Sequence, residues 1–252
     1  MYRIRFHGRG GQGMKTASRL LGAAFFLEGY EVQDAPRYGA ERRGAPIFAY
    51  VRASREPINE RGIILHPDLV IVADDSLVPV PAAGVMAGLT DDAVLLISTT
   101  ETAEEWKHRL NLDCTILTLP APGEVEDRLE LRYVGAECAG AAACLTGVVS
   151  KEKLEEAIRD ELAGKPGKVI ERNIEMAMEG YDRMTEQKGL VEESGLPSAK
   201  DYTPPAWIDM PFESARISSP SIHTALTSVM VRTGLWRTMR PVIEYENCKH
   251  CW

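Results

Sequence analysis

The chain has 252 residues, of which 44% are hydrophobic and 26% charged, and its formal net charge is -8 with a pI near 5.3. This composition predicts a globular protein with one sizeable α/β core and a smaller appendage. The acidic balance and the scattered basic residues exclude nucleic acid as the expected partner, because such a surface repels a phosphate backbone. The chain opens on a strand-like segment without a secretory leader, and no apolar run approaches membrane-spanning length. We therefore expect a cytoplasmic protein without a membrane partner.

The first expected unit is a strand, a glycine-rich loop and a helix. Tyr2 to His7 reads as a strand. Met14 to Glu28 carries apolar residues at the spacing of a helix that packs on a sheet. The sequence RFHGRGGQG spans the join between them.

Strands and helices then alternate. We expect strands at Glu31 to Ala35 and at Ile47 to Ala53, and further buried strands in DLVIVAD, AVLLIS and CTILTL, with a helix at Ala103 to Arg109. The stretch between the first two of these strands is rich in Pro and Gly and leaves no room for a crossover helix, which indicates a mixed sheet. The order predicts a three-layer α/β/α domain whose mixed sheet is mostly parallel.

The second half of the chain changes character twice. The small-residue run GAECAGAAACLTGVV favours close helix packing, and Lys151 to Leu162 and Val169 to Gln187 read as amphipathic helices. Beyond Gly189, prolines recur and periodic runs are few, which is typical of an extended arm. We therefore predict an α/β domain over residues 1-189, an extended arm or linker over 190-240, and a further module that starts within 241-252.

The glycine loop leaves several interpretations open. Gly8, Gly10 and Gly13 fit the dinucleotide pattern G-x-G-x-x-G between a strand and a helix, and Asp34 follows 21 residues after Gly13. The alternatives are a purely structural tight turn, and a different phosphate-binding or subunit-contact role. The candidate residues of this loop are Gly8, Arg9, Gly10, Gly11, Gln12 and Gly13. His7, at the end of the strand, either faces a substrate anion or is an ordinary hydrogen-bonded histidine at a sheet edge.

A second motif, RYGAERRGAP, argues against a simple dinucleotide fold. Such a loop has no role there, whereas arginine side chains can hold carboxylates or phosphates bidentately. The alternative is a solvated cluster of charges. The candidate residues of the motif are Tyr38, Glu41, Arg42 and Arg43, for which a subunit-contact role and a ligand role are equally favoured.

Together the two motifs carry a family resemblance. RFHGRGGQG, followed by YGAERRGAP, FAYVR, EPI and HPDLVIVAD, resembles the γ subunit of the 2-oxoacid:ferredoxin oxidoreductases over about residues 3 to 185. The C-terminal TGLWRTMRPVIEYENCKHCW resembles the entry to the ferredoxin-like δ domain of these enzymes. The chain thus resembles a γ-δ fusion.

Cys248 and Cys251 are the candidate metal ligands in that δ-like segment. A [4Fe-4S] cluster needs four thiolates at spacings such as C-x2-C-x2-C-x3-C, and these two residues supply only the first pair. We expect further sequence to complete the motif; the alternatives are a zinc half-site and a redox dithiol.

The resemblance implies a function that depends on several chains. It implies thiamine diphosphate and Mg on α and β partner subunits, [4Fe-4S] clusters, ferredoxin as electron acceptor, and coenzyme A as acyl acceptor in most members. It also implies oxidative decarboxylation of a 2-oxoacid such as pyruvate, or of oxalate, with an isolated γ-δ chain that is not catalytic. The alternative is a free-standing NAD- or flavin-binding Rossmann-like protein.

Overall fold

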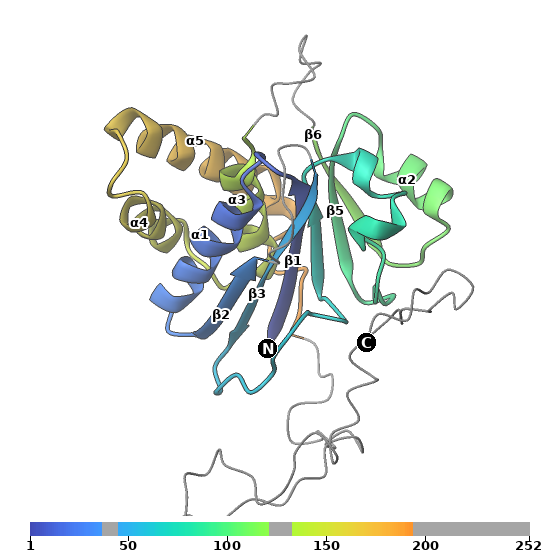
Figure 1. The fold of residues 1–252 in the computed structure, drawn as a ribbon, viewed down its shortest axis with the longest axis horizontal. Helices are drawn as coiled ribbons and strands as arrows, with labels where there is room; N and C mark the ends of the chain where they lie inside the picture. Colours follow the sequence, from blue (N-terminus) through green and yellow to red (C-terminus); the bar gives the residue numbers. More distant parts are fainter. Residues whose placement is uncertain (37–44, 121–132, 194–252) are drawn as a thin grey trace, which may run out of the picture. The chain divides into compact units, whose positions relative to one another are not determined.

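A mixed six-stranded sheet forms the centre of the computed structural model, which describes residues 1-36, 45-120 and 133-193 (Figure 1). The strands are β1 (Tyr2–Arg9), β2 (Glu31–Pro36), β3 (Pro46–Ser54), β4 (Leu69–Val72), β5 (Val94–Thr99) and β6 (Thr115–Pro120). Their spatial order is β2-β3-β1-β4-β5-β6. Strand β3 is antiparallel to both of its neighbours, whereas β1, β4, β5 and β6 pair in parallel. The predicted mixed sheet and α/β fold are therefore confirmed.

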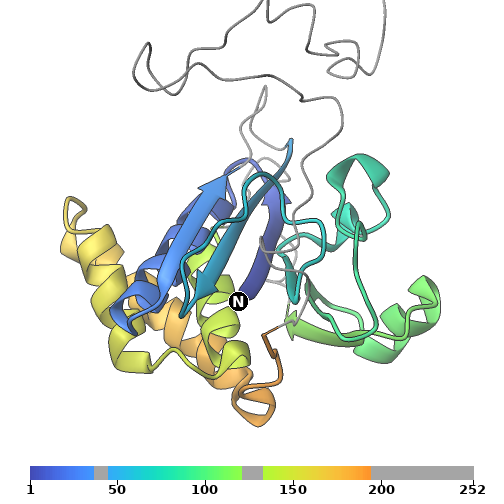
Figure 2. The same cartoon turned by 90° about the horizontal axis from the view of Figure 1, so that it is seen from below.

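Unequal layers cover the two faces of the sheet (Figure 2). The helices of the thicker layer are α1 (Met14–Leu27), α3 (Gly135–Thr146), α4 (Lys151–Glu161) and α5 (Gly167–Arg183). The opposite layer contains α2 (Ala103–Leu110) and the short 3-10 turns η1 (Asp75–Leu77) and η2 (Pro81–Ala83). The last predicted helix ends at Arg183 rather than Gln187, because the chain tightens there into the 3-10 turn η3 (Thr185–Gln187).

Side-chain alternation divides the core between the two layers. In β4, Leu69 and Ile71 pack with the thicker helical layer, whereas Val70 and Val72 pack toward α2. All four residues are buried, as are all six of β5. Burial on both faces explains why these strands read as continuous apolar runs in the sequence.

The small residues of α3 permit very close contact with α5. A Cβ added at Gly140 would lie 1.8 Å from the carbonyl oxygen of Ala177, and one added at Gly180 would lie 2.1 Å from that of Glu137. A side chain at either position would therefore overlap the backbone of the facing helix, and the two helices would have to move apart. The close helix packing predicted from GAECAGAAACLTGVV is thus present.

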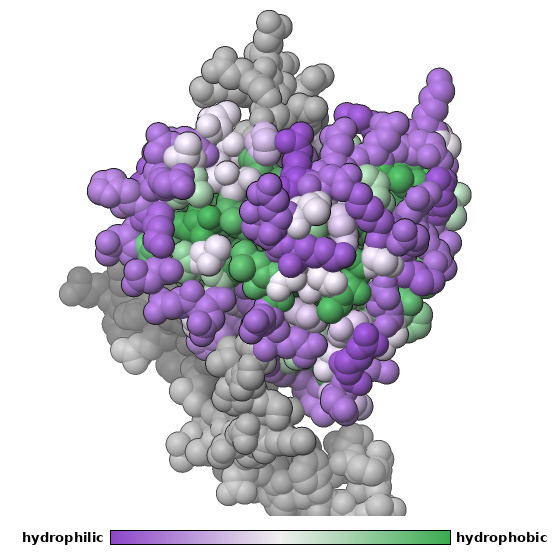
Figure 3. Space-filling model, turned by 180° about the vertical axis from the view of Figure 1, so that it is seen from behind, coloured by the Kyte–Doolittle hydropathy of each residue, from purple (hydrophilic) through white to green (hydrophobic). Residues whose placement is uncertain are grey.

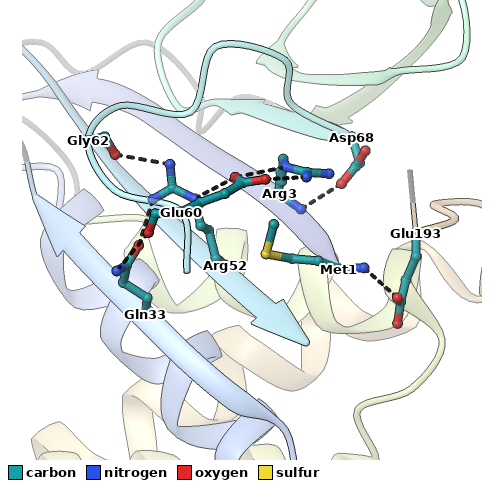
Figure 4. Close-up of polar contacts among 8 residues, drawn as sticks. All are labelled: Met1, Arg3, Gln33, Arg52, Glu60, Gly62, Asp68 and Glu193. Carbon is teal, nitrogen blue, oxygen red and sulfur yellow. Dashed lines mark hydrogen bonds and ion pairs between the residues drawn. The ribbon is translucent and has the colours of Figure 1, made fainter. Parts of the chain in front are cut away.

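The second face of β1 is polar and yet buried. Arg3, Arg5 and His7 alternate with its apolar residues and are at most 5% exposed. Glu60, in the loop from β3 to β4, forms ion pairs with Arg3 (Nη2 to Oε1, 2.5 Å) and with Arg52 of β3 (Nε to Oε2, 3.3 Å), as Figure 4 shows. One carboxylate therefore serves two buried guanidinium groups.

Arg5 fastens a second covering loop to the same face. Its Nη2 donates to the carbonyl oxygens of Val85 (3.0 Å) and Ala87 (2.7 Å), and its Nη1 donates to that of Ile64 (3.4 Å). Burial lowers the pKa of Arg5 to about 10. Over β1, therefore, the covering loops are held by hydrogen bonds from arginine side chains of the sheet.

One face of the described structure is mostly hydrophilic. Figure 3 shows hydrophilic residues over much of the face seen from behind, with hydrophobic residues in separate patches. Within the described ranges, no helix combines the length and the apolar character that crossing a membrane requires.

Candidate functional site

The glycine loop lies at the carboxyl edge of the sheet. Strands β1, β4, β5 and β6 all end at this edge because they run in parallel. The chain leaves β1 toward β2 and β3 on one side, whereas it leaves β4 toward β5 and β6 on the other. Open α/β sheets bind ligands at such a reversal of strand order. The glycine loop after β1 and the turn after β4 both lie there.

The glycine loop is held by its own side chains and backbone. The amide of Arg9 donates to Oε1 of Gln12 (2.7 Å), and Gln12 is itself buried. Gly11 (φ 107°) and Gly13 (φ 90°) adopt the left-handed conformation that favours glycine. A Cβ at Gly8 would lie only 2.7 Å from Cγ of Met14. The loop is therefore tight, and Gly11 is its exposed member.

The beginning of α3 packs directly on this loop. The amide of Val134 donates to the carbonyl oxygen of Gln12 (3.1 Å). A Cβ at Gly13 would lie 2.4 Å from the ring of Tyr133, and one at Gly135 would lie 2.4 Å from the carbonyl oxygen of Gly13. Close packing therefore explains Gly13, and the structural-turn interpretation accounts for this part of the motif.

The described residues on either side of the second motif lie at the edge of the sheet that carries the glycine loop. Tyr38, Glu41, Arg42 and Arg43 lie outside the described residues. On one flank, the amide of Gly10 donates to the carbonyl oxygen of Ala45 (2.8 Å), and Pro46 pairs with Arg9 in the sheet. On the other, β2 ends at Pro36, at the same edge. The glycine loop and the described flanks of the second motif are thus at one edge of the sheet.

Arg9 is fixed by residues that follow β4. Its Nε donates to Oδ2 of Asp74 (2.8 Å) and its Nη2 donates to Oγ of Ser76 (2.7 Å). The other carboxylate oxygen of Asp74 accepts from the amide (3.1 Å) and the hydroxyl of Ser76. Neither Asp74 nor Ser76 is among the site residues predicted from the sequence. The sequence feature that could have indicated them is the polar run DDS, which follows the buried strand β4 after one alanine. Ligands often bind at this edge of a parallel sheet.

The position of Asp34 differs from that in a dinucleotide-binding fold. Such folds place β2 beside β1, with the acidic residue at the ribose. Here β3 lies between β1 and β2. Asp34, on β2, packs against the middle of α1: a Cβ added at Gly22 of that helix would lie 3.5 Å from the Cβ of Asp34. The spacing of Asp34 in the sequence therefore does not carry the NAD or flavin alternative.

His7 is buried beneath η2 rather than turned toward a ligand. Its side chain is 2% exposed, its Nδ1 lies 3.1 Å from the carbonyl oxygen of Ala83, and its ring stacks on Phe48 at 5.4 Å. Burial, with the charge of Arg5 as a smaller cause, lowers the pKa of His7 to about 3. Its Nε2 has no hydrogen-bond partner among the described residues. A neutral buried ring favours the structural interpretation over anion binding.

The depressed pKa of His7 predicts pH-dependent stability. The unfolded chain takes up a proton near pH 6.5 and the folded protein only near pH 3, so stability falls as the pH drops through this window. The slope is about 1.4 kcal/mol per pH unit, or about 2 kcal/mol between pH 6.5 and 5.0. Urea unfolding of wild type and His7→Gln at both pH values measures it. The variant should lack this component, whereas His66→Gln, at an exposed position, should retain it.

The described residues do not fit an iron-sulfur cluster. They contain no group of three or more His, Cys, Asp or Glu side chains that could hold a metal ion. Cys114, Cys138 and Cys144 are buried free thiols, and burial raises the pKa of Cys138 to about 12. Cys248 and Cys251 lie outside the described residues.

Comparison with known proteins gives the family. The model of the pyruvate ferredoxin/flavodoxin oxidoreductase family matches residues 3-183. The chain belongs to this family. A Pyrococcus furiosus protein named pyruvate/ketoisovalerate oxidoreductases common subunit gamma is 39% identical over 191 residues, covering 73% of this chain and 97% of that protein. The pyruvate synthase subunit PorC of Methanothermobacter marburgensis is 40% identical over 186 residues, covering 73% and 98%.

A solved structure of the family has the same fold. The crystal structure of the pyruvate oxidoreductase subunit PORC from Thermotoga maritima is 31% identical to this chain, with a TM-score of 0.58. The match covers 72% of this chain and 95% of the solved chain. The family resemblance inferred from the two motifs is therefore confirmed, and these family members are subunits of oxidoreductases.

Proposed function

We propose that this chain is the γ subunit, fused to the start of a δ-type domain, of a thiamine-diphosphate-dependent 2-oxoacid:ferredoxin oxidoreductase. The observation that carries the proposal is the likeness to two γ-type subunits, each matched over nearly its whole length. The division into residues 1-189, 190-240 and 241-252 is part of this proposal. Cytoplasmic location follows from the same role.

The carboxyl edge of the sheet is the surface that meets the catalytic subunits. In this proposal the glycine loop approaches the α and β subunits, which hold thiamine diphosphate and Mg, and it helps to shape the side from which coenzyme A enters. The loop is held by hydrogen bonds from its own residues and from the start of α3, so it can present main chain to a neighbouring surface at little entropic cost. The loop of Tyr38, Glu41, Arg42 and Arg43 contributes contacts to a subunit or a ligand.

Electrons leave through the δ-type domain in this proposal. A bound [4Fe-4S] cluster would supply one-electron transfer to ferredoxin. Cys248 and Cys251 would provide two thiolates, and two more ligands must come from further sequence or another chain. Among the described residues the cysteines are buried, and no group of three or more possible ligands is present, which is consistent with a cluster in the C-terminal segment.

The substrate is a 2-oxoacid such as pyruvate, or oxalate, in this proposal. The names of two relatives specify pyruvate/ketoisovalerate oxidoreductases and pyruvate synthase. An oxalate enzyme would need no coenzyme A. Activity of the purified complex with pyruvate, other 2-oxoacids and oxalate, each with and without coenzyme A, distinguishes these substrates.

Purification from native cells tests the subunit role. A tagged chain should co-purify with thiamine-binding subunits, and the complex should reduce ferredoxin or a dye with a 2-oxoacid or oxalate. The chain alone should turn over nothing. Full activity of the isolated chain would refute the proposal. Binding of NAD by the isolated chain in calorimetry, abolished by Gly10→Val, would favour the dinucleotide alternative instead.

A further inference from the structure

We propose that a buried water molecule bridges Arg5 and His7 on the covered face of β1, accepting a hydrogen bond from Nε of Arg5 and donating one to Nε2 of His7. The inference concerns a water site inside this chain. It does not rest on the proposed function, because its residues and its test belong to the chain alone.

Each of the two side chains has one polar atom left over. The Nη atoms of Arg5 donate to carbonyl oxygens of the covering loops, whereas its Nε has no hydrogen-bond partner among the described residues. In His7, Nδ1 lies 3.1 Å from the carbonyl oxygen of Ala83, and Nε2 has no partner within the described ranges. Because a carbonyl oxygen only accepts, Nδ1 carries the proton of the neutral ring and Nε2 is an acceptor. The pair thus offers one donor and one acceptor.

The two side chains lie together under one segment of the chain. Arg5 and His7 are two residues apart in β1, so they point to the same face of the sheet. The carbonyl oxygen of Ala83 faces His7, whereas those of Val85 and Ala87 accept from Arg5. The charge of Arg5 contributes to the low pKa of His7, which also indicates that the two groups are near one another.

Burial makes an unpaired state of these atoms unfavourable. Arg5 and His7 are 3% and 2% exposed, so bulk solvent does not reach the two nitrogens. Nearly all buried polar groups of folded proteins are hydrogen-bonded, because a buried donor or acceptor without a partner is costly. Buried water molecules commonly supply the missing bonds, and each of them bonds to several groups that protein atoms leave unpaired.

The chemistry of the pair selects water over an ion. A chloride ion would accept from Nε of Arg5, but it would also meet the lone pair on Nε2 of the neutral His7. A metal cation would suit Nε2, but the buried guanidinium of Arg5 would repel it. Water is neutral and both donates and accepts, so it satisfies the two nitrogens at once.

A high-resolution crystal structure of the full chain, grown with bromide in place of chloride, tests the site. The electron density should show one peak within hydrogen-bond distance of both Nε of Arg5 and Nε2 of His7, without the anomalous signal of bromide. The inference would be overturned by the absence of a peak, by two peaks that each bond to only one of the nitrogens, or by a bromide ion.

Two variants show whether His7 holds the water. His7→Phe should lose the peak, because it removes the acceptor, whereas His66→Gln, at an exposed position, should keep it. A peak that persists unchanged in His7→Phe would count against the bridge as firmly as a missing peak in the wild type.

Nitrogen NMR of the full chain, labelled at histidine, gives an independent measurement on the wild type. The signal of His7, assigned by its loss in His7→Gln, should show Nδ1 protonated and Nε2 unprotonated. The Nε2 resonance should also be shifted upfield by the hydrogen bond that it accepts. A protonated Nε2 would overturn the inference, because that nitrogen would then be a donor.

Discussion

Replacing Glu60 with glutamine should lower the free energy of unfolding by about 3 kcal/mol. The substitution removes the carboxylate that two buried guanidinium groups share, those of Arg3 and Arg52. Both arginines are buried under the loop from β3 to β4, so water cannot readily solvate the guanidinium groups once the carboxylate is gone. The hydrogen bonds from Arg3 and the charges of both arginines hold the pKa of Glu60 below its usual range, so protonation should weaken the same contacts.

Urea unfolding at pH 7 measures this effect, with Glu101→Gln as the matched control. Glu101 makes a bidentate pair with Arg109, but on the exposed surface of α2. The control should therefore change stability far less than Glu60→Gln does. Equal effects of the two substitutions would show that the buried arginines do not depend on Glu60.

Replacing Gly13 with alanine should destabilise the domain by about 2 to 5 kcal/mol. A positive φ of 90° costs an alanine roughly 1 to 2 kcal/mol. The new Cβ would also overlap the ring of Tyr133, at 2.4 Å, and such overpacking costs about 1 to 3 kcal/mol. Because α3 begins at this contact, we also expect the complex to assemble less well.

Gly84→Ala separates the two causes. Gly84 has φ 66° and nothing within 4 Å of an added Cβ, so its substitution should cost only the backbone term. Combining Gly13→Ala with Tyr133→Ala should recover part of the overlap cost in a double-mutant cycle. Thermal or urea unfolding of the four variants gives the comparison. If Gly13→Ala lowers the stability no more than Gly84→Ala does, the packing role of Gly13 is contradicted.

The sequence was informative where residue spacing reflects local geometry. The continuous apolar runs of β4 and β5 predicted strands buried on both faces, and the stretch between β2 and β3, too short for a crossover helix, predicted a mixed sheet. The small residues of α3 predicted close helix contact. Each of these signals depends on neighbouring positions along the chain.

What the sequence did not reveal depends on residues that are distant in the chain. Arg9 and Asp74 meet only because β1 lies beside β4, and no periodicity specifies that pairing. Arg5 is buried because loops cover it, although an alternating strand ordinarily turns its polar face to water. Asp34 matched the dinucleotide spacing, yet the order of the strands placed it elsewhere.

Site-specific photocrosslinking in the assembled complex tests the central claim most directly. A photoreactive residue at Lys15, exposed in the first turn of α1, reports on the glycine-loop edge. The same residue at Lys188 reports on the end of the domain where α3 finishes, because Gly189 bonds to Cys144. The account predicts that position 15 crosslinks to a thiamine-binding subunit more strongly than position 188. A position 15 that crosslinks to no thiamine-binding subunit would contradict it.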